Sequence, residues 1–278
     1  MATVGTPANR VKVRTNSRSS THRDVGPPEL QPTDTPTLRG GDLLQYPHDR
    51  SYFYAMTTTT AKTLTEETDP FCLPSARAAQ LLAGSPWRRF AVAGDSLAAG
   101  TGGPSPGYAH LPWGDRVAGA LREVCPRLVY LNTGTIGATT ADTLRRQLDE
   151  IVAFGPDLLH ISCGANDLFR QRPDFDAVER TARRVFERAA GTGARLTTFT
   201  LGRAFHVPAF PDFPERVRAI NAITLGLAVE FDVVVIDMWD HPVNARPDLL
   251  SADRIHFSAS GQAVLASEVI NALAHTLR

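Results

Sequence analysis

Two short segments of the chain contain the side chains that acyl transfer to a serine requires. Ser96 lies in the tetrapeptide 94–97 (GDSL), and Asp253 and His256 stand three residues apart in the tetrapeptide 253–256 (DRIH). A serine hydroxyl is a weak nucleophile at neutral pH, so it needs an imidazole to take its proton and a carboxylate to orient that imidazole. We therefore predict that Ser96 is a nucleophile, His256 its general base and Asp253 the partner of the base.

Two further segments hold groups suited to the same chemistry. Residues 132–137 are NTGTIG and residues 164–167 are GAND. Negative charge develops on the carbonyl oxygen during acyl transfer, and donors that are already in place stabilise it. The backbone N–H of Ser96, the backbone N–H of a glycine in the first segment and the carboxamide of Asn166 are donors of the right kind. We expect these groups to form an oxyanion hole.

Five short apolar runs predict strands, and the amphipathic stretches between them predict helices. The predicted strands are 89–93 (RFAVA), 128–131 (LVYL), 158–162 (LLHIS), 195–201 (RLTTFTL) and 233–237 (VVVID), and apolar residues at helical spacing cover 113–124, 144–152, 178–189, 215–230 and 260–276. Strand–helix alternation predicts a five-stranded parallel sheet with helices on both faces, because parallel neighbours need crossovers. The predicted class is a three-layer α/β/α sandwich. Strand order 2-1-3-4-5 is expected by analogy with the flavodoxin-like arrangement.

These predicted elements place the four motifs at one edge of the sheet. Three of the motifs directly follow a predicted strand, and residues 253–256 lie between the last strand and the last helix. In open α/β sheets the reactive crevice lies outside the carboxyl ends of the strands. We therefore expect the four motifs to meet in space although they are far apart along the chain.

The four motifs, in this order, resemble those of the SGNH/GDSL hydrolase family over about residues 88–275. The resemblance implies the flavodoxin-like fold of that family and a GDSL-like lipase or esterase activity. It implies catalytic Ser96, Asp253 and His256, and an oxyanion hole from Ser96, Gly137 and Asn166. The family's spacing from Asn132 favours Gly137 over Gly134, which is the alternative within the same segment.

The predicted function is hydrolysis of an ester or related acyl bond in a small molecule through an acyl-serine intermediate. Two alternatives stay open: an acyltransferase that uses the same site, and a non-catalytic binding module of the same fold. We expect no metal and no cofactor, since the three cysteines have no metal-ligand spacing and 94–103 lacks a nucleotide-binding glycine pattern. The serine does not lie in GxSxG, so an α/β-hydrolase elbow is not predicted.

Loops at the same edge are candidates for the walls of the site. The segment 205–214 (FHVPAFPDFP) follows the fourth predicted strand, and 102–113 (GGPSPGYAHLPW) follows the first motif. Apolar walls of this kind suit an acyl chain. We expect Asp95 and Asp167 to accept hydrogen bonds that fix their loops.

The first part of the chain differs from the rest in composition. Residues 1–70 are rich in Thr, Ser, Pro, Arg and Gly, which predicts a disordered extension with a possible translation start at Met56, and 71–278 is the predicted hydrolase domain. The net charge is zero, so no nucleic-acid partner is expected. Neither an apolar signal core nor eighteen consecutive apolar residues occur, and three free cysteines are typical of a reducing compartment. We therefore expect a cytoplasmic protein without a membrane span.

Overall fold

The computed structural model describes residues 64–278. The predicted extension up to residue 63, with the possible start at Met56, lies outside the described residues. Residues 64–70 were assigned by composition to the extension, but they pack against the rest of the chain. The Asp69 side chain is fully buried and accepts a hydrogen bond of 2.7 Å from the Tyr108 hydroxyl, so polar contacts rather than apolar periodicity hold this segment.

Five strands form one parallel sheet in the order β2-β1-β3-β4-β5, as expected. The strands are β1 (Arg89–Gly94), β2 (Val129–Asn132), β3 (Leu158–Ser162), β4 (Arg195–Phe199) and β5 (Val234–Ile236). β1 lies inside the sheet, and its last residue, Gly94, pairs with Ser162 of β3. On the other side, the last pair between β1 and β2 is Val92 with Asn132. The carboxyl end of β1 therefore extends beyond β2.

The described helices follow the predicted pattern with two differences. They are α1 (Ser75–Leu81), α2 (Trp113–Val124), α3 (Thr140–Arg146), α4 (Leu148–Phe154), α5 (Phe175–Ala190), α6 (Phe213–Glu230) and α7 (Ala259–His275), with 3₁₀ helices η1 (Asn166–Phe169) and η2 (Pro242–Ala245). α1 was not predicted, because its short sequence buries only Ala78 within the helix. The predicted helix 144–152 is instead two helices, α3 and α4, which meet at Gln147.

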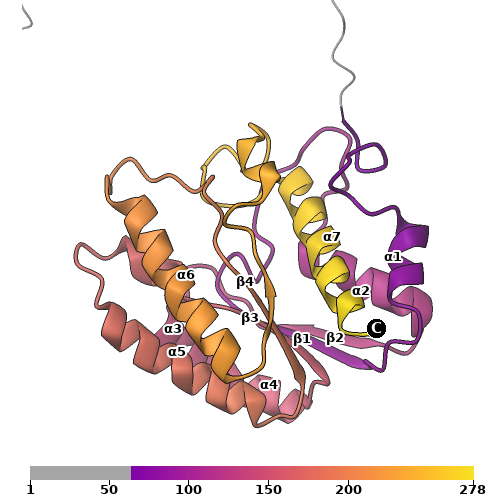
Figure 1. The fold of residues 1–278 in the computed structure, drawn as a ribbon, viewed down its shortest axis with the longest axis horizontal. Helices are drawn as coiled ribbons and strands as arrows, with labels where there is room; N and C mark the ends of the chain where they lie inside the picture. The colour runs from indigo at the N-terminus through magenta and orange to yellow at the C-terminus, as the bar shows by residue number, and fades with distance from the viewer. Residues whose placement is uncertain (1–63) are drawn as a thin grey trace, which may run out of the picture. The chain divides into compact units, whose positions relative to one another are not determined.

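Helices cover both faces of the sheet, which makes three layers (Figure 1). Alternate residues of each strand point to opposite faces. Phe90 and Val92 of β1 therefore pack in the cluster that contains side chains of α1, α2 and α7, whereas Ala91 and Ala93 pack with side chains of α3, α4, α5 and α6. The predicted class, a three-layer α/β/α sandwich, is confirmed.

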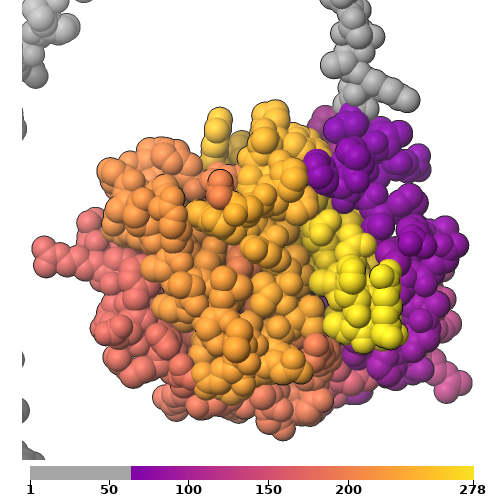
Figure 2. All heavy atoms as spheres, in the orientation of Figure 1, coloured from indigo at the N-terminus to yellow at the C-terminus, as the bar shows by residue number. Residues whose placement is uncertain are grey.

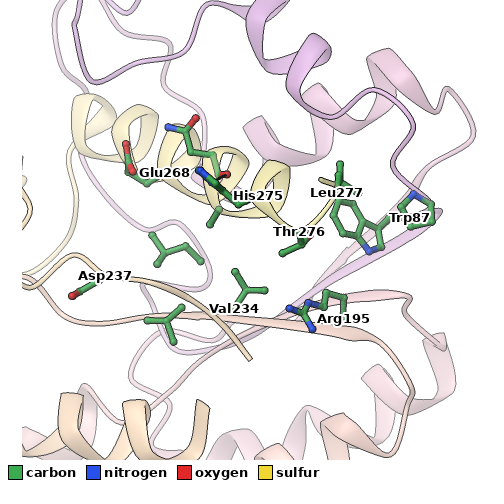
Figure 3. Close-up of a pocket in the computed structure, with 13 residues that line it drawn as sticks. Trp87, Arg195, Val234, Asp237, Glu268, His275, Thr276 and Leu277 are labelled. Carbon is green, nitrogen blue, oxygen red and sulfur yellow. Dashed lines mark hydrogen bonds between the residues drawn. The ribbon is translucent and has the colours of Figure 1, made fainter. Parts of the chain in front are cut away.

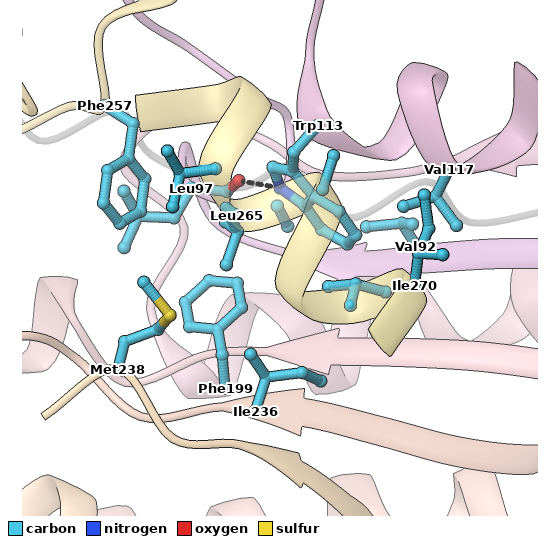
Figure 4. Close-up of a cluster of buried hydrophobic side chains, with 14 of the residues drawn as sticks. Val92, Leu97, Trp113, Val117, Phe199, Ile236, Met238, Phe257, Leu265 and Ile270 are labelled. Atoms are coloured by element: carbon cyan, nitrogen blue, oxygen red, sulfur yellow. Dashed lines mark hydrogen bonds between the residues drawn. The ribbon is translucent and has the colours of Figure 1, made fainter. Parts of the chain in front are cut away.

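The first of these clusters reaches the loop that follows β1. Trp113 at the start of α2 is fully buried, and its indole N–H donates a hydrogen bond of 2.8 Å to the carbonyl of Leu97 (Figure 4). Leu97 and Phe257 are buried in the same cluster, beside Leu265 of α7. The core thus anchors both the segment after Ser96 and the segment after His256.

The N-terminal part of the described chain packs beside the C-terminal helix. α1 contacts both α2 and α7, and Figure 2 shows the indigo residues next to the yellow end of α7. The backbone N–H of Leu73 donates to the hydroxyl of Ser267 on α7 at 2.9 Å. Within residues 64–278, no helix has the length and apolar character needed to cross a bilayer.

Candidate active site

The turn after β1 presents Ser96 at the carboxyl edge of the sheet. Gly94 has φ +144°, and a Cβ there would lie 1.7 Å from the carbonyl oxygen of Ser162, so only glycine fits. Ser96 then begins a single turn in which the N–H of Thr101 donates to the Ser96 carbonyl. Because the indole of Trp113 holds the same turn at Leu97, the position of the serine is set from both sides.

Ser96, His256 and Asp253 form one hydrogen-bonded chain. His256 Nε2 lies 2.8 Å from Ser96 Oγ, and His256 Nδ1 lies 2.7 Å from Asp253 Oδ2. The serine is buried, the imidazole is partly exposed and the carboxylate is at the surface. The structure thus brings together the three residues that the sequence places in two motifs 160 positions apart.

The turn 253–256 fixes the carboxylate of Asp253. Its Oδ1 accepts the N–H groups of Ile255 and His256, each at 3.0 Å, and Arg254 between them adopts a left-handed φ of +59°. Partial burial acts to raise the pKa of Asp253, but hydrogen bonds from His256 and from these N–H groups outweigh it and hold the pKa below 3.8. Asp253 is therefore ionised at neutral pH and faces the imidazole as an acceptor.

Backbone contacts tie the His256 loop to the loop after Ser96. The N–H of Ser251 donates to the His256 carbonyl at 2.7 Å, and the Ser251 hydroxyl accepts the N–H of Gly103 at 2.7 Å. The Gly103 carbonyl in turn accepts the N–H of Ala259, the first residue of α7, at 2.8 Å. These hydrogen bonds therefore link the two halves of the site directly.

The predicted oxyanion donors are available at the same edge. Within residues 64–278, the N–H groups of Ser96 and Gly137 donate to no protein acceptor. Gly137 is exposed with φ +76°, and Asn166 uses one Nδ2 hydrogen for the Ala138 carbonyl, at 3.0 Å, which leaves a second. The alternative, Gly134, instead packs on the chain after Ser96, where a Cβ would lie 2.5 Å from the nitrogen of Ala99.

Asp95 and Asp167 fix their loops as predicted. Asp95 Oδ1 accepts the N–H of Leu97 at 2.9 Å, and Asp167 Oδ2 accepts both the N–H and the hydroxyl of Thr140 at 2.8 Å. Burial raises the pKa of the Asp95 carboxyl to about 6, although N–H groups of Leu97 and Ala98 lower it. The turn that contains Ser96 therefore includes a buried carboxyl group that costs stability when it is ionised.

A small apolar cavity opens beside Ser96 and Asn166. Its walls come from η1, the loop after β4, the start of α6 and the turn before His256: Leu97, Ala165, Phe169, Leu201, Phe205, Val207, Phe213, Arg254 and Ile255. The expectation that 205–214 forms a wall is confirmed. Residues of 102–113 do not line this cavity; Gly102 and Gly103 instead line another pocket with Ala259 and Gln262.

Sequence reasoning missed several of these wall residues. Phe169 stands three residues after Asn166, so it is carried to the cavity by the same 3₁₀ helix, and Ile255 lies inside the motif with Asp253 and His256. Their proximity to the motifs was the available signal. Leu201 had no such signal, because it extends a strand pattern that ends earlier than predicted.

A separate hollow lies between β5 and the end of α7. Val234, Asp237, Glu268, His275 and Leu277 are among the residues around it (Figure 3). None of the residues in the hydrogen-bonded chain lines it. Within the described part of the chain, no group of three or more His, Cys, Asp or Glu side chains is placed to hold a metal ion.

Comparison with known proteins agrees with this architecture. The model of the GDSL-like lipase/acylhydrolase family matches residues 92–264, which is more than half of the chain and includes all four motifs. No curated protein sequence matches the chain significantly.

Solved structures of several esterases and hydrolases share the fold. An α/β hydrolase enzyme from the metagenome of Lake Arreo, LAE5, is 20% identical with a TM-score of 0.57, over 70% of this chain and 97% of that one. The lipase/acylhydrolase from Enterococcus faecalis is 20% identical with a TM-score of 0.54, over 68% and 96%. The acetylxylan esterase Axe2 from Geobacillus stearothermophilus is 20% identical with a TM-score of 0.55, over 69% and 94%.

Proposed function

Because the chain belongs to the GDSL-like lipase/acylhydrolase family, we propose that it is a serine esterase that cleaves a small acyl ester through an acyl-Ser96 intermediate. The main support is the hydrogen-bonded chain Ser96–His256–Asp253, with distances of 2.8 and 2.7 Å. The first contact joins the attacking oxygen to the nitrogen that would take its proton, and the second joins the other ring nitrogen to the carboxylate.

In the acylation step, Ser96 Oγ attacks the carbonyl carbon of the ester while its proton passes to His256 Nε2. The resulting imidazolium is stabilised by the carboxylate of Asp253, which stays ionised. The same proton then passes to the alcohol oxygen as the bond between carbon and leaving oxygen breaks. In the second half, water gives a proton to His256 Nε2 and its oxygen attacks the acyl carbon. The bond between the acyl carbon and Ser96 Oγ then breaks, the proton passes from His256 to Ser96 Oγ, and the acid is released.

The oxyanion formed in each half-reaction would accept the N–H groups of Ser96 and Gly137 and the second Nδ2 hydrogen of Asn166. Donors that are fixed before the reaction stabilise developing charge without reorganisation. Loss of one such donor typically lowers kcat by about 100- to 1,000-fold.

The apolar cavity suggests where the acyl group binds. Phe205, Val207 and Phe213 line the same cavity as Ser96 and Asn166. Aromatic and aliphatic walls favour a hydrocarbon acyl chain over a charged one. We therefore propose short, unbranched acyl esters as substrates, since bulky aromatic side chains crowd this cavity.

The test is hydrolysis of 4-nitrophenyl butyrate by purified wild type and Ser96→Ala. The variant should lose at least about 1,000-fold in kcat, because no other hydroxyl contacts His256 Nε2 in residues 64–278. A fluorophosphonate probe should label the wild-type protein at Ser96, and mass spectrometry would locate the label.

Ser85→Ala is the matched control. Ser85 is also buried, its hydroxyl has no partner in the described residues, and it lies before β1, at the opposite edge of the sheet. This variant should retain wild-type kcat and labelling. Full activity of Ser96→Ala, or a label on another residue, would refute the proposed mechanism.

A further inference from the structure

Gln147 is a buried carboxamide at the break between α3 and α4. Gln147 is only 2% exposed, and its backbone dihedral angles (φ −116°, ψ −36°) depart from those of a regular helix. A buried amide that breaks a helix needs compensating hydrogen bonds, because a buried polar group without a partner destabilises the fold. These bonds lie at the end of β1, not within the helix.

The carboxamide of Gln147 makes two hydrogen bonds to a single residue, Gly94. Gln147 Oε1 accepts the Gly94 N–H at 2.8 Å, and Gln147 Nε2 donates to the Gly94 carbonyl at 2.8 Å. This is the pattern that a neighbouring strand would supply. The last pair between β1 and β2 is Val92 with Asn132, and beyond it the chain after β2 still donates one hydrogen bond to Gly94, from the Thr135 N–H to the Gly94 carbonyl. It offers no acceptor for the Gly94 N–H, so Gln147 completes the pattern that β2 leaves unfinished.

The same carboxamide also reaches the loop that contains Gly137. Thr133 Oγ1 lies 3.3 Å from Gln147 Oε1, and the N–H of Thr135 donates to the Gly94 carbonyl at 3.1 Å. Gly94 is two residues before Ser96, and Thr135 is two residues before Gly137. One buried group is thus bonded to the chain that leads to the nucleophile and to the chain that leads to an oxyanion donor.

We propose that Gln147 is a positioning residue for the reaction, which sets the distance between the Ser96 hydroxyl and the Gly137 N–H. It does not touch the substrate. Its effect is on the transition state, because a misplacement of about 1 Å in reacting groups can cost about 100-fold in rate. This inference rests on the proposed function, since it concerns the geometry of acyl transfer to Ser96.

Gln147→Glu tests the donor half of the contact. A Glu carboxylate has the shape of the carboxamide but only acceptors, and it would face the Gly94 carbonyl. Burial raises the pKa of such a carboxyl group, and its protonated form again has one donor and one acceptor. The ratio of variant to wild-type kcat should therefore rise about tenfold from pH 8.5 to pH 5.5. Asp95, the buried carboxyl beside Gly94, is present in both proteins, and its negative charge would raise the pKa of a carboxyl group at position 147 further, in the direction of the expected trend.

Asn221→Asp is the matched control, because Asn221 makes the same pair of bonds at the end of β4. Its carboxamide accepts the Leu201 N–H at 2.8 Å and donates to the Leu201 carbonyl at 2.9 Å. Leu201 lines the cavity, so this variant should raise KM, while its kcat changes less than about threefold and its kcat ratio is flat with pH.

Both variants and Gln147→Leu are assayed below the onset of unfolding and normalised to active sites titrated with fluorophosphonate. Gln147→Leu should lower kcat about 10- to 100-fold at nearly unchanged KM. A kcat within threefold of wild type for the titrated Gln147→Leu sites, or a flat pH ratio for Gln147→Glu, would overturn the inference. A wild type that neither labels nor hydrolyses would instead reject the proposed function.

Discussion

At the scale of single residues, the site depends on carboxyl groups in opposite environments. Asp253 is at the surface, where hydrogen bonds from His256 and Ile255 lower its pKa. Asp95, which precedes Ser96 in the chain, is buried, and burial raises its pKa to about 6. The first is suited to orient an imidazolium and the second to hold the turn. Each environment leads to a separate prediction.

Asp253→Asn should lower kcat by about 1,000- to 10,000-fold, the range known for this change in other serine triads. The Asn oxygen can still accept the N–H groups of Ile255 and His256, so the turn should survive. The Asn Nδ2 would donate to His256 Nδ1. The neutral imidazole then carries its proton on Nε2, the nitrogen that faces Ser96, and cannot accept the serine proton there. Steady-state kinetics and thermal unfolding of the same sample check both parts, and a variant with normal kcat would contradict the role of Asp253.

Asp95→Asn should increase the free energy of unfolding relative to wild type, and this increase should be larger at neutral pH than at pH 4. In wild type the folded state binds the Asp95 proton more tightly than the unfolded state, so stability falls as pH rises from about 4 to 6. An Asn at this position does not titrate, so it removes the loss of stability with rising pH, and its side-chain oxygen can still accept the hydrogen bond from the Leu97 N–H. The free energy of unfolding of the variant relative to wild type should rise by about 2 kcal/mol from pH 4 to pH 7, as measured by urea denaturation. A pH-independent difference would show that the carboxyl of Asp95 does not titrate in this range.

At the scale of elements, β3 carries a neutral histidine into the core. His160 is fully buried between the rings of Trp113 and Phe199, and its Nδ1 lies 2.9 Å from Thr197 Oγ1 on β4. Nε2 of His160 has no partner within the described residues. Burial lowers the pKa of His160 to about 3, so the folded strand excludes the charged ring.

In His160→Gln, the free energy of unfolding should fall less than in wild type when the pH is lowered from 7 to 5. The unfolded state takes up a proton near pH 6.5 and the folded state does not, so wild type loses stability as pH falls. This contribution is about 2 kcal/mol between pH 7 and pH 5. It has the opposite sign to that of Asp95, so each must be measured from its own variant. Urea denaturation at several pH values should give a flatter profile for His160→Gln, and an unchanged slope would contradict the assignment.

At the scale of the whole molecule, the N-terminal segment of the described chain joins the loop that leads to Asp253. Arg246 is paired with Asp69 and Asp248, and Tyr108 donates to Asp69 at 2.7 Å. Hydrogen bonds from Phe71, Arg246 and Tyr108 hold the pKa of Asp69 below its usual value, against the effect of burial. Asp69 and Arg246 are therefore both charged at neutral pH, and their ion pair links the N-terminal segment to the loop that leads to Asp253.

Asp69→Asn should lower the free energy of unfolding by about 3 kcal/mol, since it leaves the partly buried guanidinium of Arg246 with one partner fewer. The loss should shrink at acid pH, because wild-type Asp69 contributes its stability only above its lowered pKa. Urea denaturation measures the change. Asp149→Asn is the control, since the Asp149 side chain is 83% exposed and its pair with Arg188 should contribute little. Equal effects of the two substitutions would contradict a stabilising link at Asp69.

The order of the five strands and the residues that meet at the sheet edge follow from patterns that are visible in the sequence. Strand and helix periods are local properties of the chain, so five strands and their crossovers were predictable, as was the convergence of Ser96 with His256. Motif positions after strands then follow from parallel topology. Composition does not distinguish residues 64–70 from the segment before them, although Asp69 is buried, because polar contacts leave no periodic pattern.

The groups that hold the site in place are recognised only from contacts between elements that are distant in the chain. Gln147 occurs within an ordinary amphipathic pattern, and nothing local distinguishes a buried carboxamide bonded to Gly94, 53 positions away, from a solvated one. The pairing of Asp69 with Arg246 spans 177 positions. Such contacts depend on how helices pack on the sheet, and packing is settled by the shapes of many side chains together, not by the period of any one segment.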